Sequence, residues 1–214
     1  MCGFFVAFSH HICFMQGMEY PLKLRCKVLA MAPQIFLEDA QGNSIAYIRQ
    51  KMFKFKEHVE VYTSKDKQNL VANINANKII DWSAKYTFTD SGGAELGSVG
   101  RQGMRSLWKA TYIVFAAGTD DIKFTIEEEN PFAKIFDALL GEIPVVGILS
   151  TVLFQPKYIV KRSGSDEIVL RLTKKPALFE SKFELSKLAE LTTQEELNLL
   201  LSLQMLTLLE RSRG

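Results

Sequence analysis

Cysteine and histidine are scarce in this sequence. The chain of 214 residues holds three of each, and its cysteines, Cys2, Cys13 and Cys26, all lie near the start. An odd number of cysteines at one end does not form the disulfide framework of a small secreted domain, and no Asn-x-Ser/Thr acceptor occurs. His10 and His11 have no partner at C-x-x-C or H-x-x-x-H spacing, so we expect no metal and no cofactor. We therefore predict a reducing, cytoplasmic location.

The chain also lacks an excess of charge of one sign. Lys and Arg together number 26, Asp and Glu 24, and the net charge is +2. Proteins that bind nucleic acid are usually strongly basic, so we expect no nucleic-acid partner. Any electrostatic partner must therefore be bound by a local patch of the surface.

Two segments are strongly apolar but unsuited to export or to spanning a membrane. Residues 1–17 have neither the basic n-region nor the cleavage site of a secretory signal. We treat them as an uncertain N-terminal arm, either natural or due to a start upstream of Met18. Residues 143–154 contain a Pro and a Gly and are too short and too broken to cross a bilayer. A buried strand and a membrane-seeking loop are both open interpretations of this segment.

No catalytic motif occurs in the sequence. Gly97, Gly100 and Gly103 match neither G-x-G-x-x-G nor a Walker loop, so we expect strand kinks or turns there. His58 lies in a polar stretch with no visible Ser, Cys or Asp partner. Trp108 lies near two basic residues and would suit base stacking, but we expect a core position instead. We therefore predict that the protein is not an enzyme.

Apolar and polar residues alternate with a period of two from about residue 20. In residues 81–90, Trp82, Ala84, Tyr86 and Phe88 fall on one face, which is typical of a half-buried β-strand. Clusters of turn-forming residues occupy 38–43, 64–69, 90–93 and 163–166. These clusters predict four hairpins.

A similar short run follows each turn cluster. The runs are Ile45–Ile48, Val71–Ile74, Leu96–Val99 and Val169–Leu172, and their last residues lie 26, 25 and 73 residues apart. The final gap is near three periods. A weak repeat of about 25 residues is what a meandering antiparallel barrel leaves in a sequence. Chance is the alternative, because turn residues are commonly followed by β-branched ones.

Other strands and one short helix fit between these hairpins. We predict strands at residues 52–62, 105–115 and 122–127, with Ile122, Phe124 and Ile126 pointing inward, and three more between 157 and 186. Asn130-Pro131 is typical of a helix start and predicts a short helix over residues 131–140. The total is about twelve strands.

The last segment, residues 192–211, predicts a helix that is apolar on every side. From Leu197 to Leu209, nine of thirteen residues are Leu or Met and none is charged. A surface helix needs a charged face, so lipid or protein must surround this one. Its rise of about 20 Å is less than the roughly 30 Å of a bilayer core, which favours the protein interior. Thr193 and Glu196 have the spacing of a capping box at its start. The expected core residues are Leu197, Leu200, Leu201, Leu203, Met205 and Leu208.

About a dozen hairpin strands before a wholly apolar C-terminal helix resemble the tubby C-terminal-like superfamily. Within it, the sequence looks most like the LURP-one-related (LOR) branch and, more distantly, is similar to phospholipid scramblases. The likeness rests on residues 39–51 (DAQGNSIAYIRQK), on the same turn-and-strand form near Gly92 and Gly164, and on residues 195–201 (EELNLLL) at the helix start. It extends over nearly the whole chain from about residue 20. Residues 120–154 are longer than we expect of compact members.

The resemblance implies a fold and a general kind of function. It implies a mainly β protein, a closed antiparallel barrel of about twelve strands around the C-terminal helix, with residues 18–214 forming one domain. Tubby proteins bind phosphoinositides and scramblases act at membranes, whereas the LOR branch has no settled activity. The tubby phosphoinositide residues cannot be matched one by one onto this chain.

Two groups of basic residues are candidates for binding anionic lipid. The candidates are Arg49, Lys51, Lys54, Lys56, Lys161, Arg162, Arg171, Lys174 and Lys175. Residues 157–175 carry six basic and two acidic residues, and residues 120–142 two basic and seven acidic. Anionic lipid attracts each cation by about 1 kcal/mol near the surface, so several on one face would hold the domain to a membrane. The alternative is the solvated exterior of a barrel, where Lys also protects strands from mispairing.

We therefore expect a non-enzymatic, monomeric barrel that lies peripherally at a membrane surface. It would bind anionic phospholipid or phosphoinositide headgroups, or act as a membrane-linked scaffold. The alternative is a protein-interaction module that uses the barrel edge or residues 120–154, with no lipid role.

Overall fold

The computed structural model describes residues 17–27, 34–49, 58–77, 85–102, 111–129, 156–177 and 180–211. In these residues the strands are β1 (Leu22–Lys27), β2 (Gln34–Glu38), β3 (Ser44–Arg49), β4 (His58–Tyr62), β5 (Leu70–Ala76), β6 (Lys85–Thr89), β7 (Glu95–Arg101), β8 (Thr111–Phe115), β9 (Ile122–Glu128), β10 (Lys157–Arg162), β11 (Ile168–Lys175) and β12 (Glu180–Lys187). The helix, α4, spans Thr193–Arg211. The predicted helix at 131–140, the segment 143–154 and nearly all of the N-terminal arm lie outside the described residues.

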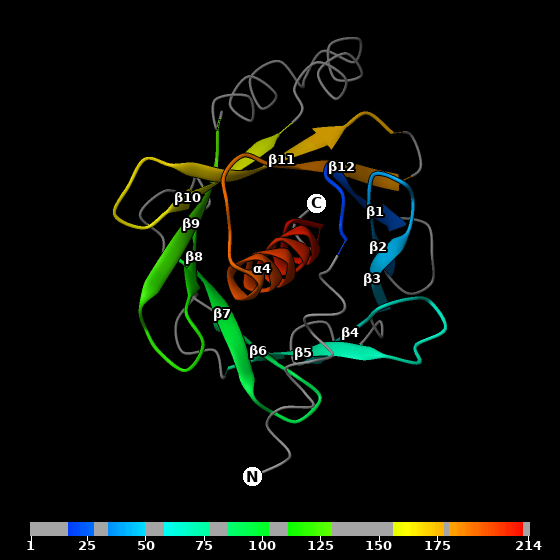
Figure 1. Ribbon diagram of the computed structural model, residues 1–214, viewed down its shortest axis with the longest axis horizontal. Coiled ribbons are helices and arrows are strands. Elements are labelled where there is room, and N and C mark those ends of the chain that lie inside the picture. Colours follow the sequence, from blue (N-terminus) through cyan, green and yellow to red (C-terminus); the bar gives the residue numbers. More distant parts are fainter. Residues whose placement is uncertain are drawn as a thin grey trace, which may run out of the picture.

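The twelve strands close into one antiparallel barrel. Each strand pairs with its neighbours in the chain, and β1 pairs with both β2 and β12, which closes the ring. Figure 1 shows α4 in the middle of this ring, enclosed by strands on all sides. The predicted barrel of about twelve strands around a C-terminal helix is therefore confirmed.

The hairpins repeat one local geometry. The register shifts beside the turn in the β2–β3, β4–β5, β6–β7, β8–β9 and β10–β11 hairpins. In two of the turns an aspartate side chain accepts a hydrogen bond from the amide four residues later. These pairs are Asp39 with Asn43 and Asp90 with Ala94, both at 2.8 Å. The repeated bulge bends each strand pair, which helps a sheet to curve into a barrel.

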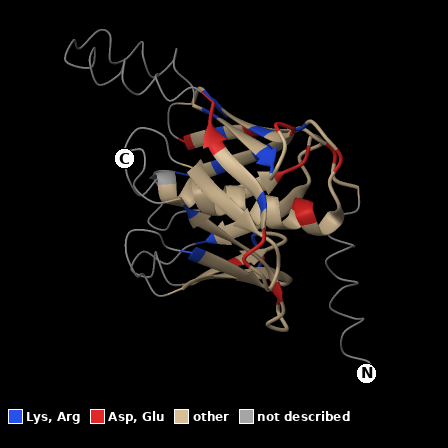
Figure 2. Cartoon of the chain, turned by 90° about the vertical axis from the view of Figure 1, so that its left-hand side faces the viewer, with Lys and Arg blue, Asp and Glu red and all other residues tan. Residues whose placement is uncertain are grey.

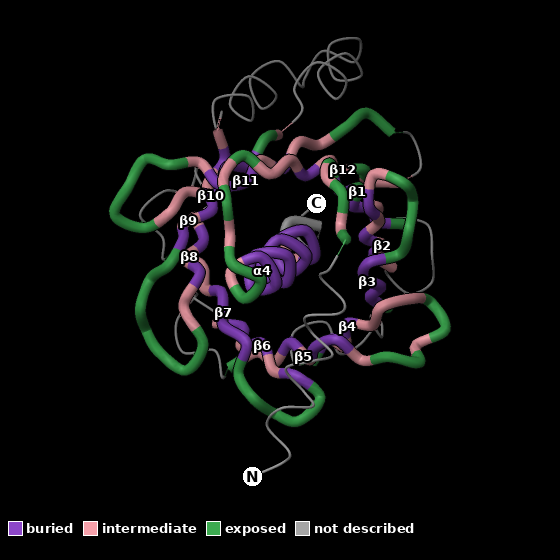
Figure 3. Tube along the Cα trace, viewed as in Figure 1, coloured by how far each residue is buried: buried purple, intermediate pink, exposed green. Residues whose placement is uncertain are grey.

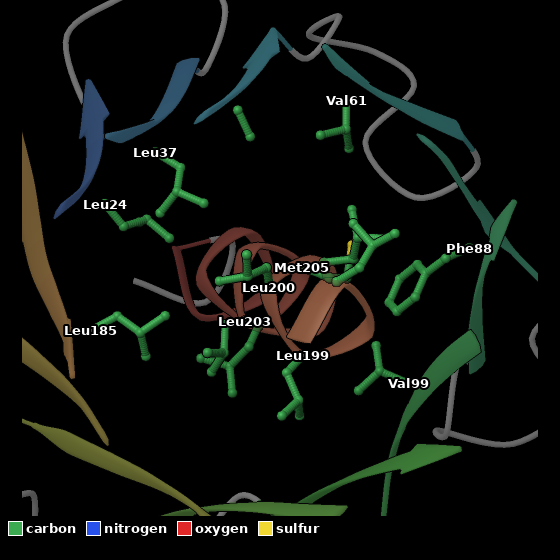
Figure 4. Packing of buried hydrophobic residues seen from close by; sticks show 14 of the residues in the cluster. Leu24, Leu37, Val61, Phe88, Val99, Leu185, Leu199, Leu200, Leu203 and Met205 are labelled. Atoms are coloured by element: carbon green, nitrogen blue, oxygen red, sulfur yellow. The ribbon is translucent and has the colours of Figure 1, made fainter. Parts of the chain in front are cut away.

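Inward rows of side chains from the strands pack against α4. Alternate residues such as Leu22 and Leu24 in β1, or Tyr86 and Phe88 in β6, are buried, whereas the residues between them are exposed or half-buried. Figure 3 shows α4 buried along most of its length after its first turn, while the hairpin turns are exposed. In Figure 4, Leu24, Leu37, Val61, Phe88, Val99 and Leu185 point from the strands toward Leu199, Leu200, Leu203 and Met205 of the helix. Burial of these apolar side chains is the main source of stability.

The uncharged polar residues of α4 are buried together with its leucines. The six expected core residues, from Leu197 to Leu208, are each at most 3% exposed. Asn198 donates from Nδ2 to the Phe115 carbonyl at 2.8 Å. Ser202 and Thr207 donate to carbonyls four residues earlier in the helix, also at 2.8 Å. These three hydrogen bonds satisfy the donors of Asn198, Ser202 and Thr207 inside the barrel, whereas the side-chain oxygens of Asn198 and Gln204 are buried without a hydrogen-bond partner among the described residues.

Two sequence-based details were wrong. The capping box is formed by Thr192 and Glu195, not by Thr193 and Glu196: the Glu195 carboxylate accepts from the Thr192 amide at 2.9 Å, and the Thr192 hydroxyl accepts from the Glu195 amide at 3.3 Å. Both pairs have the same spacing, so sequence alone did not separate them. Ile122 was expected to point inward but is 44% exposed. It lies beside the bulge at Phe115, where β9 leaves the turn.

Candidate functional site

The strand topology places many of the charged residues at one or the other of the two ends of the barrel. We call the end that holds the turns at 39–43, 63–69, 90–94, 116–121 and 163–167 the turn end; α4 also begins there. We call the opposite end, where β3, β7 and β11 finish and toward which α4 runs, the far end. Every candidate residue in the described strands can be placed relative to these two ends.

The turn end is acidic. Its acidic residues are Glu19, Glu38, Asp39, Asp66, Asp90, Glu95, Asp120, Asp121, Asp166, Glu167, Glu190, Glu195 and Glu196. The basic residues at the same end are Lys23, Lys65, Lys67, Lys123, Arg162 and Lys187. Figure 2 shows many of the red segments on the side of the barrel where the helix begins, although a red strand end also lies away from that side. Carboxylates at a helix start also interact favourably with the helix dipole.

Two polar clusters fix the start of α4 to the barrel wall. The Tyr20 hydroxyl donates to the Glu196 carboxylate, and Lys187 Nζ lies 3.3 Å from the other oxygen of Glu196. Burial, together with the neighbouring Glu196 carboxylate, raises the pKa of Tyr20. In the second cluster, Arg162 Nη1 lies 2.9 Å from Glu195 Oε1. Burial acts to raise the pKa of Glu195, but hydrogen bonds from Thr192 and Arg162 outweigh it and the pKa is lowered.

Four of the predicted lipid-binding residues are already paired with carboxylates. Lys161 lies 2.7 Å from Glu127, Arg171 lies 3.3 Å from Glu129, and Lys175 lies 3.0 Å from Glu184. Arg162 contacts Glu167 at 2.8 Å in addition to Glu195. The pKa of Lys161 is raised by its hydrogen bond to Glu127 and that carboxylate's charge. These four cations therefore add little net positive charge to the surface on which they lie.

Arg49 and Lys174 differ from those four residues. Both lie at the far end, and neither forms an ion pair within the described residues. Arg49 is exposed at the end of β3, and Lys174 is half-buried near the end of β11, where its backbone amide donates to the Pro156 carbonyl at 3.1 Å. The remaining candidates, Lys51, Lys54 and Lys56, lie outside the described residues.

Arg101 and Lys157 belong with Arg49 and Lys174; the basic run of residues 157–175 includes Lys157, whereas Arg101 was not a candidate. Arg101 ends β7 and Lys157 begins β10, so both lie at the far end, and neither has an ion-pair partner among the described residues. We call Arg49, Arg101, Lys157 and Lys174 the far-end cations. A sequence signal exists for three of them: Arg49, Arg101 and Lys174 come one or two residues after Ile48, Val99 and Leu172, which end three of the repeated runs.

The family comparison supports the architecture. Residues 44–143 match the family model for LURP-one-related proteins. This LOR match begins at β3 and includes every strand through β9, and the family belongs to the tubby-like superfamily. It confirms in part the resemblance drawn from the sequence; the likeness to scramblases stays a prediction. A search of the curated proteins found no match to the chain.

Four other features of the described residues bear on the expectations drawn from the sequence. In the described residues, no group of three His, Cys, Asp or Glu side chains is arranged to hold a metal ion. His58, at the start of β4, shares a hydrogen bond of 2.7 Å with Asn75 at an exposed position. Gly97 lies against the side-chain amide of Asn198, so it serves helix packing. Within the same residues, no helix has both the length and the hydropathy required to cross a bilayer.

Proposed function

We propose that the protein is a non-enzymatic, tubby-like barrel that binds peripherally to anionic membrane phospholipid through its far end. The supporting observation is the separation of charge along the barrel axis. The far-end cations have no carboxylate partner among the described residues, whereas many acidic residues lie at the turn end. The carboxylates of Glu127, Glu129, Glu180 and Glu184, in or beside β9 and β12 and away from the turn end, each contact a Lys or Arg side chain. A substrate in the barrel centre would have to displace α4, which argues against an enzyme.

Four cations give a weak, reversible association. Each Lys or Arg near an anionic surface contributes about 1 kcal/mol, so the four together supply about 4 kcal/mol. That free energy corresponds to a Kd of about 1 mM, and salt screens it beyond about 8 Å at physiological ionic strength. The acidic turn end is repelled by the same surface. The barrel therefore docks in one preferred orientation, with the far end toward the lipid.

Co-sedimentation with vesicles tests this proposal. Vesicles of phosphatidylcholine are compared with vesicles that also contain phosphatidylserine, at low and at physiological salt. We expect binding only to the anionic vesicles, weakened by salt. The variant R49E/K174E should lose binding. The control K65E/K123E changes the net charge equally, but at exposed residues of the turn end and of β9 near its turn. Binding that is insensitive to salt, or equal loss in both variants, would contradict the proposal.

A protein-interaction role is the second candidate. Barrel closure argues against the barrel-edge version of it, because β1 and β12 pair with each other and neither has a free edge. The other version uses residues 120–154, of which 130–154 lie outside the described residues. A pull-down that survives charge reversal at Lys174 and Lys175 but fails when this segment is deleted would favour the interaction role.

A further inference from the structure

We infer that the far end responds to the surface charge of an anionic membrane and does not select one phosphorylated headgroup. This inference rests on the proposed function and specifies its ligand. It follows from how the far-end cations are distributed around the barrel.

Arg49, Arg101 and Lys174 are spaced evenly around the far end. They lie on β3, β7 and β11, and in the closed strand order three other strands separate each of these from the next. Four spacings of ~4.8 Å put roughly 19 Å of sheet between neighbouring cations. A charge-assisted hydrogen bond to phosphate needs an N···O distance of about 2.7–2.9 Å, so two such cations do not converge on one phosphate group.

Lys157 and Lys174 do not form a pair of cations that could bind one phosphate group together. In the register of β10 and β11, Lys157 pairs with Thr173, the residue before Lys174. Successive residues of a strand point to opposite faces, so Lys157 lies on the outer face while Lys174 continues the inward row of Leu170 and Leu172. The two ammonium groups therefore leave the sheet in different directions.

Lys175 and Lys182 do face each other across β11 and β12, but carboxylates neutralise both. They are direct cross-strand partners, so their two ammonium groups are placed where they could bind one phosphate together. Glu184 lies 3.0 Å from Lys175, and Glu180 lies 3.0 Å from Lys182. These two carboxylates would repel a phosphorylated headgroup. The far end thus presents separated single cations, which suit a flat surface of many anionic lipids.

The test compares vesicles of matched surface charge. One set carries phosphatidylserine and the other phosphatidylinositol bisphosphate, adjusted to the same zeta potential and titrated with the full chain. At matched charge we expect affinities within about twofold of each other, and no competition from soluble inositol trisphosphate. A phosphoinositide preference of about tenfold or more, or displacement by the soluble headgroup, would overturn the inference.

Removing the carboxylates beside Lys175 and Lys182 tests whether they prevent headgroup selection. E180Q/E184Q removes the two carboxylates beside Lys175 and Lys182 and leaves the far-end cations in place. We expect this variant to gain a phosphoinositide preference of about fivefold or more that the native chain lacks. Absence of any gain would refute the role assigned to Glu180 and Glu184. Absence of binding to both vesicle types would refute the proposed function itself, a result distinct from binding with headgroup preference.

Discussion

Replacement of Gly97 by alanine tests whether α4 packs against β7 as closely as the structure shows. Gly97 lies in β7 with φ of +141°, a backbone conformation that favours glycine. A Cβ placed on Gly97 would overlap the side-chain amide of Asn198, with Oδ1 only 2.6 Å away. Asn198 has little freedom to move, because its Nδ2 donates to the Phe115 carbonyl.

The expected destabilisation has two parts. Backbone strain at such a φ costs about 1–3 kcal/mol, and overpacking costs about 1–3 kcal/mol. A total of about 4 kcal/mol would lower the Tm of a chain of this size by about 8–16 °C. N198A alone loses its hydrogen bond to the partly buried Phe115 carbonyl and should cost about 1–3 kcal/mol. In G97A/N198A the overlap is gone, so the double variant should cost about 1–3 kcal/mol less than the sum.

Urea unfolding followed by circular dichroism measures these free energies. Gly100→Ala is the matched control in the same strand, because its Cβ would meet Phe115 at 3.6 Å and Lys85 at 4.0 Å, which are ordinary contacts. We expect it to be close to neutral. A G97A variant as stable as the G100A control, or costs in the double variant that add to within about 0.5 kcal/mol, would refute the close seating of α4 against β7.

Three further predictions concern α4 and its anchors. Leu203 is 1% exposed, so Leu203→Ala should lower the free energy of unfolding by about 2–5 kcal/mol, measured by urea unfolding. Because the folded pKa of Glu195 is lowered, its stabilisation is present above the ordinary carboxyl pKa and is lost as pH falls through the folded value. Glu195→Gln should cost about 1 kcal/mol at neutral pH and flatten the acid side of the stability profile. Tyr20→Phe removes the hydrogen bond to Glu196 and should cost about 1–2 kcal/mol; an unchanged unfolding midpoint would contradict this anchor.

The architecture was predictable because its signals are strong and local. Nine Leu or Met residues among the thirteen from Leu197 to Leu209 leave the helix with no charged face. Such a helix must be surrounded by protein or lipid. Turn residues around Gly42, Gly93 and Gly164 marked hairpins, and each of these glycines has a positive φ. The strands β10 and β11 also lie within the predicted range of 157–186, and β12 extends one residue beyond it, to Lys187. Both kinds of signal depend on residues close together in the chain.

The candidate site was less predictable because it depends on register. Lys161 and Arg171 looked like available cations, yet cross-strand neighbours place Glu127 and Glu129 beside them. Those carboxylates are 34 and 42 residues away in sequence (161 − 127 and 171 − 129). Arg101 was not among the candidates, because nothing in its segment of sequence indicated which end of the barrel it occupies. Only the strand order shows that it shares one end of the barrel with Arg49.

Pairing of β1 with β12 has a consequence for how the chain acquires its structure. The first and last described strands must meet before the ring is complete, and the residues that fill its centre follow the last strand. Contacts between such distant segments slow folding, since a long stretch of chain must be ordered before they form. During synthesis, the hydrophobic inner rows of the early hairpins therefore stay uncovered until α4, which follows β12, has left the ribosome, and chaperone binding at that stage is expected.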